Sequence, residues 1–506
     1  MPTKRLTTTN ILFTSRTQRL GAIVAVFNKN KNTATKETIQ ALKTLQHRGK
    51  DMHGIATHNQ VQLAKKINEL ETKQFETHIA LGYNFARIIP EDTPQPVLTQ
   101  KFALAFEGRL HAQKTKNSLE KFKTYLGENY KENAVKATAT LDGAFSFAIA
   151  NNKEIIAGRD PMGTIPLYYG ENQNICAVAS EKKALWNIGI LNAKSFPPGN
   201  VAVINEKGFT FRAAKTLTQQ QTTSLTIEKA AEKLQALLLH SCRKRLGDTE
   251  KVAVAFSGGL DSSLIALCAK LCNIKVHLLT VGLEEKEEIS HARKAASALE
   301  LPITIKTYTL NDVEKILSPV LWLIEEAETT QLAIAIPLYW TAQLASQLGF
   351  HVLLAGQGSD ELFGGYHKYL TEYAKCGFEG LQKAMWKDIA SLHEKNFERD
   401  NKVCAYHNVE LRLPFADFEL ATFAVSLPPE MKITSKDDTL RKRILRTAAI
   451  NLGMPAFIAN RRKKAIQYAT GVNNALKKIA SKKGLTIKGY VQNCFQKIYP
   501  TLEEKT

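Results

Sequence analysis

The spacing of apolar and polar positions divides the chain into two regions of different character. Between about residues 21 and 215, short apolar runs such as 21–28, 102–110 and 143–152 are separated by turns rich in Asn, Gly or Pro. Apolar runs of that length, bounded by such residues, are typical of strands. One early segment, 33–49, places its apolar residues at helical spacing instead. This region is therefore predicted to be a strand-rich α+β domain.

The second region begins after a polar, Thr-rich linker at 216–226. Apolar runs typical of buried strands, at 251–256 and 276–283, alternate there with helical segments such as 227–246 and 261–272. Strands that alternate with helices favour a parallel sheet covered by helices on both faces. The pattern predicts an α/β domain, so the fold class of the whole chain is α/β plus α+β.

The two domains are expected to span 21–215 and 227–480, and the second becomes mainly helical from about residue 370. Residues 481–506 are Lys-rich and weakly patterned, which predicts a basic tail. Residues 1–20 are basic and Thr-rich and lack the apolar core of a secretory signal, which favours a flexible extension. A mitochondrial-type presequence is the alternative for that segment.

Charge and cysteine content narrow the expected partners and compartment. The formal net charge is +20, but Lys and Arg are spread along the whole chain, and no basic stretch is interleaved with aromatic residues. An anionic small-molecule substrate accounts for this charge, and we do not expect a nucleic-acid partner. The seven cysteines are scattered without C-x-x-C pairs, which argues against a disulfide framework or a zinc site and fits a reducing cytoplasm. No apolar run reaches the roughly 18 residues that a membrane span needs.

The clearest chemical motif is a Gly-rich loop between the strand at 251–256 and the helix that follows it. The loop consists of Ser257, Gly258, Gly259, Leu260, Asp261 and Ser262. Two glycines let the backbone approach a phosphate closely, and amide groups at a helix start bind anions. Asp261 adds a hard oxygen ligand for Mg²⁺. A Gly-Gly pair alone would indicate only a turn and a helix cap, but six such residues in this setting predict an ATP phosphate site.

A second strand–loop–helix unit, at 354–366, repeats this design. Its loop and first helical turn contain Ala355, Gly356, Gln357, Gly358, Ser359, Asp360 and Glu361. Loops at the carboxyl ends of parallel strands face one crevice, so Asp261 and Asp360 are predicted to share Mg²⁺ and pyrophosphate. The alternative role of Asp360 and Glu361 is to cap the first turn of their helix.

Five segments, in this order and spacing, resemble the asparagine synthetases. They are SGGLDS at 257–262, TVGL at 280–283, GQGSDELFGGY at 356–366, VELRLPFAD at 409–417 and RRKKAIQYATG at 461–471. The first region resembles the class II glutamine-amidotransferase domain of these enzymes, for example in LQHRG at 45–49 and GRDPMGTIPLYY at 158–169. The resemblance, strongest to archaeal members, implies an N-terminal-nucleophile (Ntn) hydrolase-like α/β sandwich. It also implies a second domain of the adenine-nucleotide α-hydrolase-like, or PP-loop, synthetase type.

The resemblance also implies a reaction. ATP and the side-chain carboxylate of aspartate form β-aspartyl-AMP and pyrophosphate, and ammonia then gives asparagine and AMP, with Mg²⁺ as the metal. In this family the residues matching Ala255 and Val281 lie beside the adenosine, and Ala355 and Gly356 lie near ATP. The catalytic Lys of the family falls on Lys463, where Arg462 replaces a Pro.

The substrate-binding candidates carried over from the family are Arg412 and Glu361. Arg412 is expected either to orient aspartate or the phosphates, or only to pair with Glu410. Gln357 stands where the family usually has the Glu of S-G-E-G, which is linked to forming the acyl-adenylate. Gln357 stays a candidate catalytic residue, although a Gln can hydrogen-bond but cannot act as a base or carry charge.

The glutaminase half departs further from the family pattern. Gly21 takes the place of the N-terminal Cys, and the first cysteine of the chain is Cys176. The family's N-G-E appears as 107–109, Glu-Gly-Arg, and the His and Arg of L-G-H-x-R fall on Tyr83 and Phe85. Of the pocket pattern only His-Arg-Gly at 47–49 remains. We therefore expect this domain not to hydrolyse glutamine, and ammonia to come free or from a separate glutaminase.

Two other functions stay open at this stage. β-Lactam synthetases keep the same architecture without the Cys nucleophile, so another acyl-adenylating, amide-forming enzyme is the first alternative. A non-catalytic nucleotide-binding pseudoenzyme is the second. A homodimer is also left open.

Overall fold

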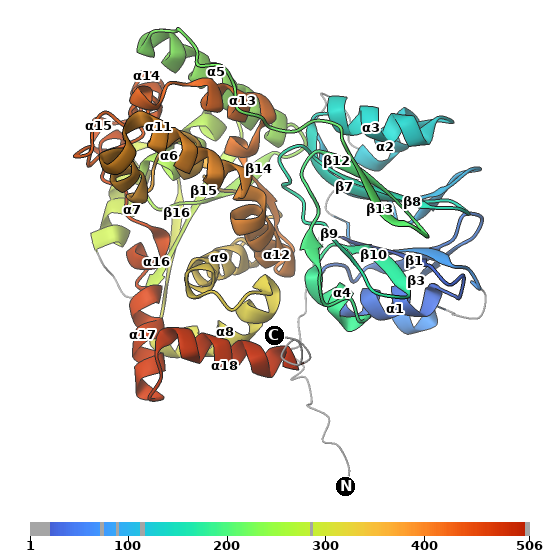
Figure 1. Ribbon diagram of the computed structural model, residues 1–506. Coiled ribbons are helices and arrows are strands. Elements are labelled where there is room, and N and C mark those ends of the chain that lie inside the picture. Colours follow the sequence, from blue (N-terminus) through green and yellow to red (C-terminus); the bar gives the residue numbers. More distant parts are fainter. Residues whose placement is uncertain (1–20, 71–74, 88–90, 112–116, 284–286, 501–506) are drawn as a thin grey trace.

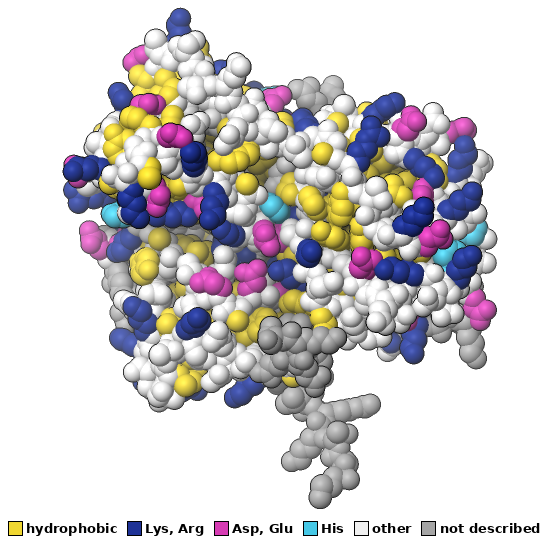
Figure 2. Space-filling model, in the orientation of Figure 1, with side chains coloured by type: hydrophobic (Ala, Val, Ile, Leu, Met, Phe, Trp, Pro, Cys, Tyr) yellow, Lys and Arg dark blue, Asp and Glu magenta, His cyan; other side chains and the backbone are white. Residues whose placement is uncertain are grey.

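The computed structural model describes residues 21–70, 75–87, 91–111, 117–283 and 287–500; the predicted extension 1–20 lies outside these ranges. Two domains lie side by side, and Figure 1 shows the stacked sheets of the N-terminal domain on the right and the helix-rich C-terminal domain on the left. Lys and Arg side chains are distributed over both domains on the face in Figure 2. No helix in the described ranges is long and apolar enough to cross a membrane.

The N-terminal domain contains two antiparallel sheets. In spatial order, the seven-stranded sheet consists of β11 (Lys194–Ser195), β9 (Tyr168–Glu171), β10 (Ile175–Ala179), β1 (Ala22–Asn28), β4 (Ile79–Phe85), β2 (Met52–Ala56) and β3 (Val61–Ala64). The six-stranded sheet consists of β13 (Gly208–Ala213), β12 (Asn200–Asn205), β8 (Ile155–Arg159), β7 (Gly143–Ala150), β6 (Ala103–Leu110) and β5 (Val97–Leu98).

Helices cover the outer face of each sheet, so the domain has four layers. Apolar side chains of both sheets, such as Ile23 and Ala148, pack against each other in the middle. Helices α1 (Thr35–Thr44) and α4 (Lys182–Asn187) pack on the seven-stranded sheet. Helices α2 (Ser118–Leu126) and α3 (Tyr130–Thr140) pack on the six-stranded one. This arrangement confirms the predicted Ntn-hydrolase-like α/β sandwich.

The prediction of a single early helix in this domain was wrong. The buried face of α3 consists of the small side chains Ala134, Ala137 and Thr138, which give almost no apolar periodicity. The sequence pattern therefore concealed α3, whereas the buried Leu119, Phe122 and Leu126 of α2 do have helical spacing.

The C-terminal domain is built on one five-stranded parallel sheet. Its order is β16 (Ile303–Tyr308), β15 (Lys275–Leu283), β14 (Lys251–Ala255), β17 (Val352–Leu354) and β18 (Glu410–Arg412). From β14 the chain continues to β15 and β16 on one side, and later to β17 and β18 on the other. The strand order therefore reverses between β14 and β17, and the crevice at such a switch point is the usual ligand site of a parallel α/β sheet.

Helices surround this sheet. The parallel sheet, its helices and the helical C-terminal part together confirm the expected α/β architecture. The helices are α5 (Ile227–Leu246), α6 (Leu260–Leu271), α7 (Glu287–Ala298), α8 (Leu310–Ile324), α9 (Thr329–Gln347), α10 (Ser359–Phe363), α11 (Lys368–Ala390), α12 (Glu398–Tyr406), α13 (Phe418–Ser426), α14 (Arg443–Asn451), α15 (Ala456–Ala459), α16 (Ile466–Ala469), α17 (Val472–Lys482) and α18 (Ile487–Ile498). The bounds of α5 equal the predicted ones, because Thr226 caps its start by accepting the amide of Lys229.

The segment predicted to be a basic tail contains a packed helix. Helix α18 spans Ile487–Ile498, and its Tyr490 and Val491 are buried in the core of the C-terminal domain. Thr486 caps the helix by accepting the amide of Gly489. The apolar residues of this segment, Ile487, Tyr490, Val491, Cys494, Phe495 and Ile498, recur at helical spacing, so the helix was predictable from the sequence. Only residues 501–506 of the predicted tail lie outside the described ranges.

Candidate active site

A cavity of about 790 Å³ opens at the carboxyl ends of β14, β15 and β17, between the two Gly-rich loops. Most of the site residues proposed from the sequence line it: Ala255, Ser257, Gly259, Leu260, Asp261, Ser262, Val281, Ala355, Gly356, Gln357, Asp360, Glu361 and Lys463. Two proposed residues, Gly258 and Arg412, are not among the described residues that line it. The switch point of the sheet thus brings both loops to one site.

The phosphate loop is held by its own backbone and hydroxyl groups. The Ser257 amide donates to Ser262 Oγ at 3.2 Å, and Ser262 Oγ donates to the Gly259 carbonyl at 3.3 Å. Gly258 turns with φ +67°, and an added Cβ would lie 3.0 Å from the Ala292 Cα. Gly259 is the N-cap of α6 and has no side chain to satisfy the first amides of the helix. Those amides therefore remain for an anionic ligand.

Two carboxylates and two ammonium groups form a compact cluster between the loops. Lys442 Nζ lies 2.7 Å from Asp261 Oδ1 and 2.7 Å from Asp360 Oδ1. Lys463 Nζ lies 2.5 Å from Asp360 Oδ2 and 3.7 Å from Asp261 Oδ2. Ser359 Oγ donates to Asp261 Oδ1 at 2.9 Å. The structure therefore brings Asp261, Asp360 and Lys463 together, and it adds Lys442 to them.

Lys442 was missed by sequence reasoning. It precedes α14 with left-handed backbone angles (φ +54°), and its side chain is 3 % exposed. Gly365 makes room for it, because a Cβ there would lie 2.3 Å from Lys442 Cε and 1.9 Å from Asp360 Oδ1. One Lys among many in an irregular segment gives no periodic signal, and only the glycine pair 364–365 hints at a close approach.

The charges of this cluster stabilise one another. Burial alone would raise the pKa of Asp360, but the ammonium groups of Lys442 and Lys463 outweigh it and hold that pKa well below its usual range. Burial alone would lower the pKa of Lys463, yet Asp360 and Asp261 raise it above its ordinary value. Both groups are therefore charged at neutral pH, as phosphate chemistry requires.

The donor set fits Mg²⁺ carried by a nucleotide. Mg²⁺ in such sites takes one or two carboxylates and completes its coordination with phosphate oxygens and water. Asp261 and Asp360 are two carboxylates from different loops, drawn to one point by Lys442. They are the residues that would hold the metal here.

Arg412 belongs to a different part of the domain. Its guanidinium donates to Glu410 Oε1 at 2.7 Å and to both oxygens of Asp248, at 2.5 and 2.9 Å. This is the pairing that the sequence left open as the alternative to substrate binding. Glu410 also accepts from Arg109 Nε at 3.2 Å, so the network joins the C-terminal sheet to β6 of the N-terminal domain.

Beyond the cluster, the cavity is lined by polar side chains of α10, of α12 and of the segments beside them. Glu361 Oε1 accepts from Tyr366 at 2.5 Å and from Asn396 at 2.6 Å. Burial, and next the nearby Asp360 carboxylate, raise the pKa of Glu361. Gln357 Nε2 donates to Asp400 Oδ2 at 2.5 Å. No sequence signal linked Gln357 to Asp400, because the two residues are 43 positions apart.

The expected nucleophile position of the N-terminal domain is filled. A Cβ on Gly21 would lie 2.0 Å from the Tyr83 hydroxyl and 2.4 Å from its Cζ. The buried Arg48 donates from Nε to the Gly21 carbonyl at 2.9 Å and from its terminal nitrogens to Glu107 at 2.5 Å and Glu181 at 3.0 Å. The cavity left beside Gly21 has a volume of only about 50 Å³.

Comparisons with known proteins agree with this architecture. The sequence model of the asparagine synthase family matches residues 233–379 and 371–497, and that of the glutamine amidotransferase domain matches 85–187. The chain is similar to a Methanocaldococcus jannaschii protein provisionally named asparagine synthetase (glutamine-hydrolyzing) 1, with 29% identity over 530 residues, 92% of this chain and 96% of that protein. It is also similar to the asparagine synthetase (glutamine-hydrolyzing) of Triphysaria versicolor, with 28% identity over 489 residues, 89% of this chain and 78% of the other.

Among solved structures, the chain is similar to the glutamine phosphoribosylpyrophosphate amidotransferase of B. subtilis in complex with ADP and GMP. The identity is 18%, the match covers 56% of this chain and 65% of that one, and the TM-score is 0.33, which is too low to support an argument. The sequence matches carry the assignment instead. The asparagine synthase match extends over 233–497, more than half of the 506 residues, and the chain therefore belongs to the asparagine synthase family.

Proposed function

We propose that this chain is an ATP-dependent ligase that converts aspartate to β-aspartyl-AMP, releases pyrophosphate and amidates the adenylate with ammonia. The observation that carries the proposal is the meeting of Asp261 and Asp360, each 2.7 Å from Lys442 Nζ, in a cavity lined by both Gly-rich loops. Carboxylates and cations that meet at a switch point can bind a nucleoside triphosphate and its metal ion.

The residues of the cluster have distinct roles in this proposal. The loop Ser257–Ser262 binds the leaving pyrophosphate through the first amides of α6 and its hydroxyl groups. Mg²⁺, held by Asp261 and Asp360, would neutralise charge on the phosphate oxygens. Lys463 supplies a fixed positive charge toward the α-phosphate and the acyl intermediate, where negative charge develops.

Ammonia is the proposed nitrogen source because the N-terminal domain lacks room for a nucleophile. The Tyr83 ring occupies the space that any side chain at position 21 would need. Arg48 forms ion pairs with Glu107 and Glu181, so the charged groups around Gly21 already have partners within the protein. These contacts support a domain that serves as a packing partner of the synthetase domain and not as a glutaminase.

The purified chain with ATP, Mg²⁺ and aspartate tests this proposal. Ammonium is expected to support formation of asparagine and AMP, whereas glutamine is expected to give neither asparagine nor glutamate. Glutamate released at the rate of asparagine formation would refute the loss of glutaminase activity. ATP–pyrophosphate exchange without any dependence on aspartate would favour another acceptor, as in the β-lactam-synthetase-like alternative, and absence of exchange would favour the pseudoenzyme.

A further inference from the structure

Helix α12 begins with five consecutive charged or amide side chains, and all five are buried. They are Glu398, Arg399, Asp400, Asn401 and Lys402, with exposed fractions of 0 to 4 %. Burying charged groups costs free energy unless partners satisfy them. The partners of these five residues therefore show which of them fix the helix in place and which remain for a ligand.

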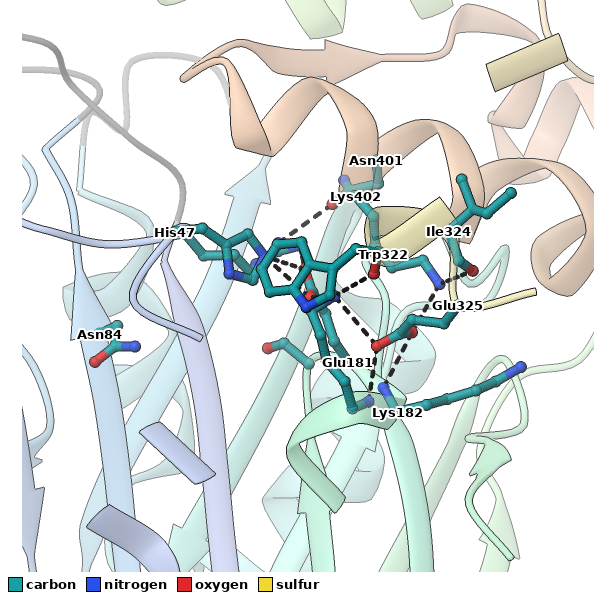
Figure 3. Close-up of polar contacts among 12 residues, drawn as sticks. His47, Asn84, Glu181, Lys182, Trp322, Ile324, Glu325, Asn401 and Lys402 are labelled. Carbon is teal, nitrogen blue, oxygen red and sulfur yellow. Dashed lines mark hydrogen bonds and ion pairs between the residues drawn. The ribbon is translucent and has the colours of Figure 1, made fainter. Parts of the chain in front are cut away.

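Three of the five anchor the helix to its surroundings, two of them to arginines of the N-terminal domain. Glu398 accepts from Arg159 at 2.8 Å, and Asn401 accepts from Arg48 at 3.3 Å. Lys402 donates to Glu325 at 2.9 Å. Figure 3 shows Asn401 and Lys402 extending from the helix toward the polar cluster around His47 and Glu325. The start of α12 is thus fixed from both domains.

The remaining two, Arg399 and Asp400, line the ATP cavity together with Gln357. Asp400 accepts from Arg399 Nε at 2.7 Å and from Gln357 Nε2 at 2.5 Å. One N–H of the Gln357 amide donates to this carboxylate, which orients the amide. Its carbonyl oxygen accepts no hydrogen bond among the described residues, and the adjacent charge makes that oxygen a stronger acceptor for a ligand. At position 357 the family pattern has Glu; here the residue is Gln, and the carboxylate of Asp400 is hydrogen-bonded to its side chain.

Arg399 offers the complementary group. Its Nη1 donates to Gln331 Oε1 at 2.6 Å, while its Nη2 is buried without a hydrogen-bond partner among the described residues. A buried guanidinium N–H without an acceptor is costly, and such a group in a binding cavity indicates a ligand that supplies the acceptor. Carboxylates and phosphates are the groups that a guanidinium binds best. Because the loop Ser257–Ser262 already provides the phosphate site of this cavity, we assign a carboxylate to Arg399.

The geometry points to a subsite for the amino-acid acceptor at this end of the cavity. Arg399 Nη2 binds a carboxylate of the acceptor, and the Gln357 carbonyl binds its ammonium group, with Asp400 supplying the negative charge that position 357 lacks. Asp400 acts through Gln357 and is therefore a positioning residue. This inference rests on the proposed function only in taking the acceptor to be an amino acid.

A charge exchange between positions 357 and 400 tests the subsite. In ATP–pyrophosphate exchange, Asp400→Asn is expected to raise the KM for aspartate by about 10- to 100-fold, the loss expected for a charge-assisted hydrogen bond. The inhibition constant of succinate, which lacks the amino group, should change less than about threefold. Gln357→Glu combined with Asp400→Asn restores the carboxylate and should recover at least about tenfold in KM.

Glu394→Gln is the matched control, because it removes an exposed carboxylate only six residues from Asp400 and should leave the KM unchanged. Thermal unfolding checks that each variant folds. The inference is overturned if Asp400→Asn weakens succinate and aspartate equally, or if the double variant is no better than Asp400→Asn. If the wild type uses another amino acid in place of aspartate, the proposed function fails. The subsite is then tested by measuring the same variants with that amino acid and with its deamino analogue. Exchange that needs an acid without an amino group, or no exchange at all, would overturn both.

Discussion

Replacement of Lys442 by Met is the perturbation that examines the centre of the site most sharply. Lys442 Nζ is 2.7 Å from one oxygen of Asp261 and 2.7 Å from one oxygen of Asp360. Without it, two nearly buried carboxylates face each other with only Lys463 to offset their charge. Met is an unbranched side chain only one atom shorter than Lys, so the change is mainly one of charge and hydrogen bonding.

The magnitude follows from the two contacts. A hydrogen bond to a charged group contributes about 1.5–3 kcal/mol, so losing two costs about 3–6 kcal/mol. If the contacts persist in the transition state, kcat/KM for aspartate adenylation should fall by about 10²- to 10⁴-fold. Gly365→Ala should lower it in the same direction without removing any charge, because its Cβ would displace Asp360 Oδ1 and Lys442 Cε.

The assay is aspartate-dependent ATP–pyrophosphate exchange, with thermal unfolding as the test of folding. Lys436→Met, which removes an exposed Lys from the same irregular segment, should retain wild-type exchange. If folded Lys442→Met and Gly365→Ala proteins exchanged pyrophosphate at the wild-type rate, the cluster would have no part in the reaction and the reasoning would be refuted.

Three further predictions concern other parts of the molecule. Gly21→Ala should destabilise the protein by about 1–3 kcal/mol, as overpacking does, and the same substitution should cost less stability in a Tyr83→Ala background, where the ring is absent. An unchanged melting temperature of Gly21→Ala would contradict this prediction. Lys463→Ala should abolish asparagine formation while the exposed control Lys477→Ala does not, and equal turnover in both variants would remove Lys463 from the mechanism. Burial, and then Arg159, lower the pKa of His393 to about 4, so the unfolded chain, with a His pKa of about 6.5, binds more protons between these values. Stability should therefore fall from pH 6.5 toward 4, and His393→Gln should show a smaller drop in melting temperature between pH 7 and 5 than the wild type does.

Local patterns in the sequence were sufficient for the elements that carry the two loops. The strand and helix around Ser257–Ser262 have continuous apolar runs and clear boundaries, so β14 and α6 lie where they were expected. Helix α3 was missed because small residues form its buried face. The apolar residues of α2 and α18 recur at helical spacing, so these two helices were predictable from the sequence although they were not predicted.

The site was predictable only where its residues belong to those loops. Lys442 contacts Asp261 across 181 positions of sequence, and Gln357 contacts Asp400 across 43. Neither pair follows a helical or strand period, so only the packed fold reveals it. Arg412 shows the reverse case: its family position suggested a ligand, but Asp248 and Glu410 satisfy its guanidinium within the protein.

Transfer of an oxygen atom from aspartate to AMP tests the central claim most directly. The purified chain would be given ATP, Mg²⁺, ammonium and aspartate labelled with ¹⁸O in its side-chain carboxylate. Formation of an acyl-adenylate and its attack by ammonia leave one carboxylate oxygen on the phosphate. The expected result is AMP with one ¹⁸O, seen as an isotope shift in its ³¹P resonance, in an amount equal to the asparagine formed. Unlabelled AMP, or ADP and phosphate in its place, would contradict an adenylating reaction at this site.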